Sequence, residues 1–163
     1  MFFRPKKIIG IDIGGTKTAV VLSDNKGNIS KKESFTTIDF QNSIQKILHI
    51  IKSFSLSNDF VVGISCGGPL DSEKGIIQSP PNLPGWDNIN FTEIISKATN
   101  APTYLMNAAN AGALAAWYFG SAKGFKNVIF LTFGTGMGGG FVLNGRLYEG
   151  TTGDAGEVGH IRM

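Results

Sequence analysis

Cysteine is almost absent from the sequence, because Cys66 is the only one among 163 residues. A single cysteine cannot form an internal disulfide, which excludes a disulfide-stabilised scaffold and favours a reducing compartment. The run Val61–Cys66 is typical of a buried strand. We therefore interpret Cys66 as a core residue rather than a nucleophile.

Long apolar stretches are also missing. No segment approaches the roughly 18 uninterrupted apolar residues that a membrane-spanning helix needs. Residues Met1–Pro5 lack the hydrophobic region of a signal peptide. We expect a cytoplasmic protein with no membrane partner.

Charge is sparse and almost balanced. The chain has 15 Lys and Arg residues against 12 Asp and Glu residues, which gives a net charge of +3. The basic residues are scattered, apart from short pairs such as Lys6-Lys7. This mild excess is compatible with a small anionic ligand and gives no support for a nucleic-acid partner.

Glycine, in contrast, is abundant, with 22 residues. Isoleucines within Ile8–Ile13 predict a strand buried on both faces, and Gly14-Gly15 then allow a tight reversal. The N–H groups of such a turn, the Thr16 hydroxyl and the Lys17 ammonium can bind one anion. Asp12 would be costly to bury unless water, a donor or a metal ion satisfies it. A phosphate with its Mg²⁺ accounts for all these groups, whereas a plain glycine hairpin is the alternative.

The remaining pattern predicts an α/β domain. After the first turn, two more strands extend to about residue 35, which gives three antiparallel strands. Helical spacing in 40–54 predicts a helix, and the strand after it, 60–66, is expected to run parallel to the first. Further expected elements are a short helix after Asn90, a strand at 103–106 and an apolar helix at about 108–119.

The segment from Ser79 to Trp86 is irregular by composition, because three prolines remove backbone donors. Two interpretations stay open. The segment is either a connector between elements or a rigid loop that presents Asn82 or Trp86 to a ligand.

A second glycine turn repeats the first. Residues 128–133 predict a strand, Gly134–Gly140 a glycine turn and Phe141–Leu143 the returning strand. The same order of elements in 7–35 and 127–148 indicates an internal repeat. Two equivalent turns suit a ligand with consecutive phosphates held between two related lobes, which we place at 1–120 and 121–163.

Five motifs in this order resemble the ROK family of sugar kinases and repressors, within the actin-like, ribonuclease-H-like ATPase superfamily. The motifs are Gly10–Lys17, Pro81–Trp86, Asn107–Asn110, Gly134–Gly140 and Ala155–His160. The resemblance implies a mixed sheet of three antiparallel and then parallel strands flanked by helices, with the start of a second similar lobe. It also implies ATP-dependent phosphorylation of a hexose or N-acetylhexosamine, and a homodimer for the whole protein.

The resemblance further implies roles for individual residues. Those expected to hold the ATP phosphates are Gly14, Gly15, Thr16, Lys17, Gly134, Thr135, Gly136 and Gly138. Those expected to contact the sugar are Asn107, Glu157 and His160, with Asn82 and Gly68 as walls of the pocket, and Asp12 would orient Mg²⁺. Such side chains suit sugar hydroxyls, which both donate and accept hydrogen bonds.

Three features depart from the family pattern. The family reads Asn-Asp-Ala-Asn at 107–110, so the Asp that takes the proton from the attacking sugar hydroxyl is replaced by Ala108. A glutamate common in the family is replaced by Ala116. Family members are also longer, so much of the second lobe is expected to lie outside this sequence. His160 matches a zinc ligand of many members, but the cysteines that would join it are absent, so zinc is expected only in a longer parent.

We therefore expect a sugar kinase that is impaired or inactive. The alternative is a non-catalytic sugar-binding regulator, which Ala108 favours. A repressor would carry a helix-turn-helix ahead of Ile8, where this sequence has only a short segment. A third interpretation is a fragment that does nothing alone and self-associates through exposed apolar surface.

Overall fold

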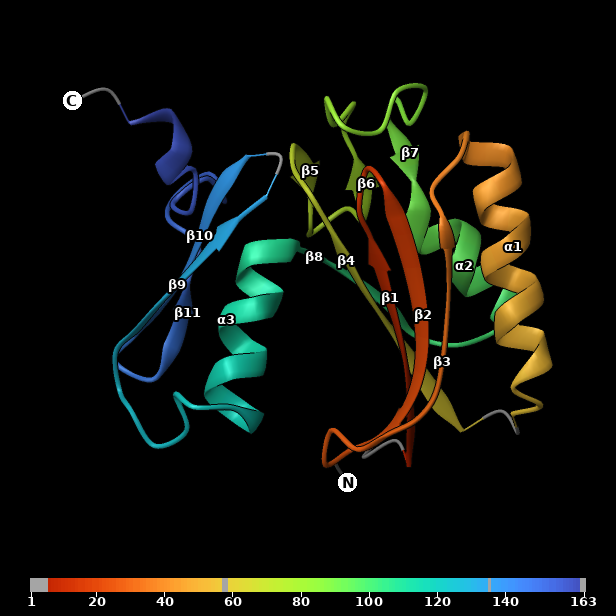
Figure 1. Ribbon diagram of the computed structural model, residues 1–163, viewed down its shortest axis with the longest axis horizontal. Helices are drawn as coiled ribbons and strands as arrows, with labels where there is room; N and C mark the ends of the chain where they lie inside the picture. Colours follow the sequence, from red (N-terminus) through yellow and green to blue (C-terminus); the bar gives the residue numbers. More distant parts are fainter. Residues whose placement is uncertain (1–5, 57–58, 135, 162–163) are drawn as a thin grey trace. The chain divides into compact units, whose positions relative to one another are not determined.

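The computed structural model describes residues 6–56, 59–134 and 136–161 (Figure 1). Their contacts divide the chain into two compact units, Met1–Met106 and Asn107–Met163. This division falls before the helix at 108–119, whereas the sequence predicts a domain boundary after it, at residue 120. The boundary at residue 120 concerns the lobes of a longer family member and stays a prediction.

The first unit contains a five-stranded mixed sheet with the strand order β3-β2-β1-β4-β8. Its strands are β1 (Lys7–Ile13), β2 (Lys17–Asp24), β3 (Ile29–Thr36), β4 (Phe60–Cys66) and β8 (Thr103–Asn107). Strand β1 pairs antiparallel with β2 and parallel with β4. Three antiparallel strands followed by a parallel one are confirmed.

One face of this sheet forms the core of the first unit. Ile9, Ile11 and Ile13 alternate along β1 and are each at most 1% exposed. Asp12 points to the opposite face and is exposed. The prediction that β1 is buried on both faces is therefore wrong for this end of the strand, because successive side chains of a strand point to opposite faces.

Two helices, α1 (Phe40–Ser53) and α2 (Phe91–Thr99), cover the core face (Figure 1). Helix α1 begins at the Asp39 cap, whose carboxylate accepts a hydrogen bond of 3.0 Å from the Asn42 N–H. Its apolar side chains Ile44, Ile47 and Ile51 join the isoleucines of β1 in one cluster. Burial of such side chains is the main stabilising term of the unit.

A small second sheet follows β4, with the strand order β5-β6-β7. Its strands are β5 (Leu70–Asp71), β6 (Ile76–Ile77) and β7 (Ile89–Asn90). Between β6 and β7, the Trp86 ring is fully buried and stacks on Phe91 with 5.7 Å between ring centroids. The interpretation that Trp86 is presented to a ligand is therefore wrong, because its ring belongs to the core.

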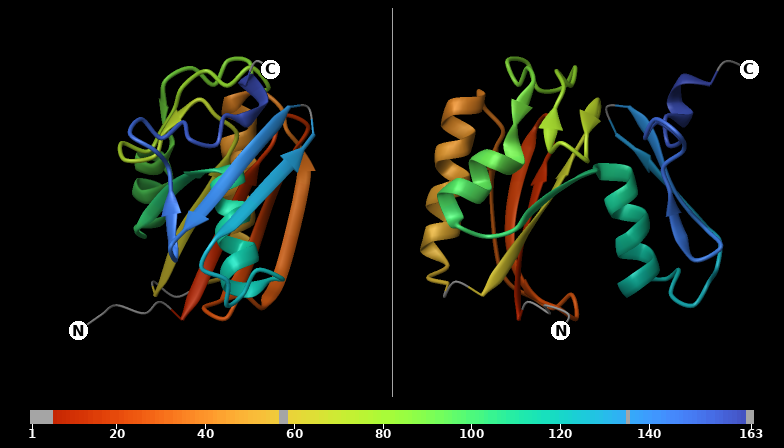
Figure 2. Two further views of the ribbon diagram at one scale, coloured as in Figure 1. Left: turned by 90° about the vertical axis from the view of Figure 1, so that its left-hand side faces the viewer. Right: turned by 180° about the vertical axis from the view of Figure 1, so that it is seen from behind.

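In the second unit, helix α3 packs on one face of an antiparallel sheet, as Figure 2 shows. Its elements are α3 (Ala108–Phe119), β9 (Val128–Phe133), β10 (Met137–Leu143), β11 (Arg146–Tyr148) and the 3-10 helix η1 (Val158–His160). The helix lies close to the sheet because Gly112 meets the Phe130 ring and Gly140 meets the Ala109 carbonyl, where no side chain would fit. Strands β9-β10-β11 form the same antiparallel meander as β1-β2-β3.

None of the helices in the described part of the chain combines the length and the apolar character that crossing a bilayer requires. The cytoplasmic location stays a prediction.

Candidate functional site

The turn between β1 and β2 is held by a hydrogen bond between its own residues and by hydrogen bonds from Thr37. The Gly14 N–H donates to the Lys17 carbonyl at 3.0 Å, which closes the turn. The Thr37 N–H donates to the Thr16 carbonyl at 3.0 Å, and the Thr37 hydroxyl donates to the Gly14 carbonyl at 2.6 Å. Thr37 was not predicted as a site residue, since it follows β3 and no local pattern links it to the turn.

These bonds occupy the carbonyl groups of Gly14, Thr16 and Lys17 and leave N–H donors available. In the described part of the chain, the N–H groups of Gly15 and Thr16 have no hydrogen-bond partner. Both residues and Lys17 are exposed. Neighbouring unpaired N–H groups beside a lysine form a site for an anionic oxygen.

Gly15 packs directly on Asn82. A Cβ atom at residue 15 would lie 2.6 Å from the Asn82 carbonyl oxygen and 2.8 Å from its Cβ atom. Gly15 therefore has no room for a side chain. The contact brings Asn82, predicted from the sequence as a wall of the sugar pocket, to the predicted phosphate turn.

Asp12 lies next to the same turn, near the end of β1. Its register partner on β4 is Ser65, whose hydroxyl donates to Asp12 Oδ1 at 3.1 Å. The carboxylate is exposed, which corrects the expectation that Asp12 is buried. Its role in orienting Mg²⁺ stays a prediction. Gly68 follows β4, whose last residue pairs with Ile13, so it comes after the same end of the sheet.

Cys66, the last residue of β4, is a core residue as predicted, with no exposed surface. Burial raises the pKa of its thiol to about 12, and the nearby Asp12 carboxylate contributes to this increase. A thiol with this pKa stays protonated at neutral pH and is a poor nucleophile.

In the second unit, the turn between β9 and β10 is shorter than the predicted turn Gly134–Gly140, because β10 already begins at Met137. The Gly134 N–H donates to the Gly136 carbonyl at 2.9 Å. Thr135, predicted as a phosphate ligand, lies outside the described residues. A Cβ atom at Gly138 would lie 3.5 Å from the Ala109 Cβ atom. The start of β10, directly after the glycine turn, therefore packs against the N-terminal end of α3.

Asn107 caps α3, as predicted. Its side-chain oxygen accepts a hydrogen bond of 2.8 Å from the Ala109 N–H, which leaves its NH₂ group as the donor for a ligand. Ala108 is the first residue of the helix and offers only a methyl group there. No proton acceptor is available on the side chain of residue 108.

Glu157 and His160 are held beside β10 by close backbone packing. The Gly139 N–H donates to the Gly156 carbonyl at 2.7 Å, and a Cβ atom at Gly159 would lie 2.5 Å from the Met137 carbonyl oxygen. Both side chains are exposed, with 3.8 Å between His160 Nε2 and Glu157 Oε2. The pair can offer hydrogen bonds to a polyhydroxylated ligand.

A zinc site is not formed by the residues that the structure describes. His160 has one nearby carboxylate, and the described ranges contain no group of three or more His, Cys, Asp or Glu residues placed to hold a metal ion. Structural zinc in a longer parent stays a prediction.

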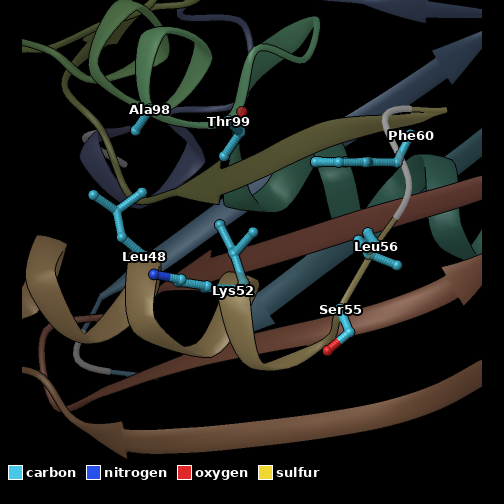
Figure 3. A pocket seen from close by; sticks show the side chains of 8 residues that line it. Leu48, Lys52, Ser55, Leu56, Phe60, Ala98 and Thr99 are labelled. Atoms are coloured by element: carbon cyan, nitrogen blue, oxygen red, sulfur yellow. The ribbon is translucent and has the colours of Figure 1, made fainter.

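The predicted site residues thus fall into two groups. The first unit holds Asp12, Gly68, Asn82 and the turn 14–17, and the second holds Asn107, Ala108, Glu157, His160 and the turn 134–138. A pocket of about 470 Å³ between α1, α2 and β4 belongs to neither group, because Phe60, which lines it, begins β4, whereas Asp12 and Gly68 are near the other end of that sheet (Figure 3).

Comparison with known proteins identifies the family of this chain. The family model described as "ROK family" matches residues 8–163. A glucokinase of Thermotoga maritima is 37% identical over 159 residues, which are 95% of this chain and 50% of that protein. A xylose repressor of Caldicellulosiruptor bescii is 32% identical over 166 residues, which are 96% of this chain and 41% of the repressor.

Solved structures give the same result. A ROK family glucokinase from Streptomyces griseus, in complex with glucose and AMPPNP, superposes with a TM-score of 0.83 at 31% identity. The match covers 96% of this chain and 51% of that one. The chain spans about half the length of the curated relatives it matches, and its fold is that of the actin-like ATPases.

Proposed function

Because the chain belongs to the ROK family over residues 8–163, we propose that the whole protein uses the γ-phosphoryl group of ATP to phosphorylate a hexose or an N-acetylhexosamine. The observation that carries the proposal is the turn 14–17. It offers unpaired N–H groups and Lys17 next to the exposed Asp12 carboxylate. Relatives named glucokinase and fructokinase support the reaction class.

Each group of residues has a distinct role in this proposal. The two glycine turns bind phosphate oxygens, because backbone N–H groups and a lysine neutralise their charge. Asn107, Glu157 and His160 bind sugar hydroxyls, with Asn82 and Gly68 as walls of the pocket. The sugar hydroxyl attacks the γ-phosphorus, the bond to the β-phosphate oxygen breaks, and the hydroxyl proton needs an acceptor.

Asp12 fits a role in binding the Mg²⁺ that accompanies ATP. Its carboxylate is exposed and receives one hydrogen bond, from Ser65 to Oδ1. Magnesium in nucleotide sites is held by one or two carboxylates together with phosphate oxygens and water. When bound, the ion would neutralise charge on the phosphates.

Ala108 explains why we propose that the reaction is slow. A positioned base contributes about 10²–10⁴-fold to a rate, and a methyl group cannot take the proton from the sugar hydroxyl. The fold around residue 108 is intact, because Asn107 still caps the helix at 2.8 Å. The loss therefore concerns proton transfer rather than binding.

The test is a coupled ADP-release assay on the protein in its natural full length, with Ala108→Asp compared with Ala108→Asn. Both side chains have the same size and differ in whether they can accept a proton. We expect the Asp variant to raise kcat at least ~10²-fold over the native protein, with little change in the KM for the sugar. Equal rates for the two variants would show that residue 108 is not the position of the base.

A sugar-binding regulator without kinase activity is the second candidate. Ala108 and the 32% identity to a xylose repressor favour it. Calorimetric titration with glucose, N-acetylmannosamine and N-acetylglucosamine, with and without Mg-ATP, separates the two. Saturable sugar binding by a natural full-length protein that releases no ADP would favour the regulator.

A further inference from the structure

Thr37 contacts the turn 14–17 from the connection between β3 and α1. Its hydroxyl donates to the Gly14 carbonyl at 2.6 Å and lies 2.8 Å from the Thr18 hydroxyl. A hydroxyl has one proton to donate, and a carbonyl can only accept. Because the Thr37 proton goes to Gly14, the Thr18 hydroxyl donates to Thr37. Thr18 is fully buried, so a directed chain of hydrogen bonds runs from the core to the turn.

This chain of hydrogen bonds determines which way the peptide group between Gly14 and Gly15 faces. The peptide bond is trans, and in a planar trans peptide the carbonyl and the N–H point in opposite directions. Since the Thr37 hydroxyl holds the carbonyl of this peptide, the Gly15 N–H points away from Thr37. In the described part of the chain, this N–H has no hydrogen-bond partner. Thr37 therefore sets the direction of a free donor in the predicted phosphate turn.

Neighbouring contacts keep both Thr37 and the peptide group in place. The Ile38 N–H, directly after Thr37, donates to the Ser43 hydroxyl at 3.2 Å, and that hydroxyl donates to the Ile38 carbonyl at 3.1 Å. Ser43 is fully buried near the start of α1. Gly15 itself packs on Asn82, where a Cβ atom would lie 2.6 Å from the carbonyl oxygen. The peptide group is thus contacted by two segments that are distant in the sequence, and each of them limits its rotation.

We propose that Thr37 is a positioning residue of the phosphate site. Through its hydroxyl, which Thr18 orients, it holds the Gly15 N–H in the direction from which a phosphate oxygen of ATP is bound. This inference rests on the proposed function, because it assigns the residue that orients the turn 14–17 for phosphate. A donor that is fixed before the ligand arrives supports tighter binding, since the ligand does not have to order it. Thr37 acts on the phosphate through the turn, without a contact of its own.

The test is calorimetric titration of the protein in its natural full length with Mg-ATP and with inorganic tripolyphosphate. The native protein is compared with Thr37→Val, which keeps the branched shape without the hydroxyl, and with Thr37→Ser, which keeps the hydroxyl. We expect Thr37→Val to raise the Kd for both ligands about tenfold, the effect of one lost hydrogen bond. Thr37→Ser should restore a Kd close to that of the native protein. A merely structural Thr37 would lower the Tm of Thr37→Val and leave both Kd values unchanged, which would overturn the proposal.

Thr99→Val is the matched control, because Thr99 is also half-buried and its hydroxyl donates to the Ile95 carbonyl at 2.8 Å in α2. We expect this variant to bind both ligands like the native protein. Thr18→Val removes the donor that orients Thr37 and should raise both Kd values by a smaller factor than Thr37→Val. It also keeps the test possible if Thr37→Val does not fold.

The outcomes separate this inference from the proposed function. Native Kd values in Thr18→Val, or an equal increase in Thr99→Val and Thr37→Val, would overturn the positioning role while the phosphate site stands. A Kd that Thr37→Ser does not restore would overturn it as well. A native protein that binds neither Mg-ATP nor tripolyphosphate would contradict the proposed function, and the role of Thr37 would fall with the phosphate site.

Discussion

The first strands of the two repeats are similar in sequence pattern and opposite in environment. Ile9, Ile11 and Ile13 of β1 lie in the core, while Ile129, Leu131 and Phe133 of β9 are exposed. The difference comes from the segments that succeed each meander in the chain. Helix α1 and strand β4 come after the first, and the described part of the chain provides no equivalent after the second. Burial of a strand is thus decided by its neighbours rather than by its own residues.

The two glycine turns differ in a related way. Gly15 is packed against Asn82, so the first turn is part of a tight contact between distant segments. Gly136 has no heavy atom of the described residues within 4 Å of where its Cβ atom would be, outside its chain neighbours. The first turn is therefore tightly packed at Gly15, whereas a side chain at Gly136 in the second turn would have space.

The largest effect that tests this comparison is the loss of a strand isoleucine. Ile9→Ala removes a fully buried side chain and should lower the free energy of unfolding of the first unit by about 2–5 kcal/mol. Ile129→Ala removes an exposed one and should cost about 1 kcal/mol or less in the second unit. Urea unfolding measures both, because each unit contains one tryptophan, Trp86 and Trp117.

The two signals can be separated in Trp117→Phe and Trp86→Phe backgrounds. Trp117→Phe is the milder background, because it leaves Trp86 in the aromatic cluster of the first unit. Similar losses of stability from the two alanine substitutions would mean that Ile129 is covered in solution, and the contrast between the units would then be wrong.

A smaller effect is expected at the turns. Gly15→Ala places a methyl group 2.6 Å from the Asn82 carbonyl oxygen, and forcing the two segments apart typically costs about 1–3 kcal/mol. Gly136→Ala meets no such contact and, by restricting the unfolded chain, should change stability by about 1 kcal/mol or less, in the stabilising direction. Urea unfolding measures both variants, and equal losses in the free energy of unfolding at the two turns would contradict the difference in packing.

Local features of the fold were predictable from the sequence. The helix at 108–119 was predicted with its bounds, because Asn107 caps it and the glycine after it ends it. The two meanders were predictable from their strand patterns and turns. In each case the signal lies within a few residues of the feature, so no knowledge of distant contacts is needed.

Features that depend on distant segments were not predictable. The bonds from Thr37 to the first turn, and the contact of Asn82 with Gly15, join residues that are far apart in the chain. The exposure of Asp12 was missed because the surrounding isoleucines suggested burial on both faces. The sequence did not decide whether Trp86 belongs to the core or contacts a ligand, since an irregular segment has no periodicity from which to infer where its side chains point.

The smallest expected effect concerns thiol reactivity, which compares the two environments directly. Cys66 is fully buried, and its pKa is raised to about 12 by burial and by Asp12. Ile129→Cys adds a thiol at a position that is 67% exposed. With a disulfide reagent at pH 8, we expect the added thiol to react fully before Cys66 reacts measurably. The pKa of Cys66 in the folded protein lies above the usual thiol pKa of about 8.5, so the unfolded chain loses this proton first as the pH rises. The contribution of the neutral Cys66 to stability is therefore complete below about pH 8.5 and decreases as the pH rises toward 12. Equal reaction rates of the two thiols would mean that the β1–β4 core opens as readily as the surface of β9, and the contrast drawn from burial would fail.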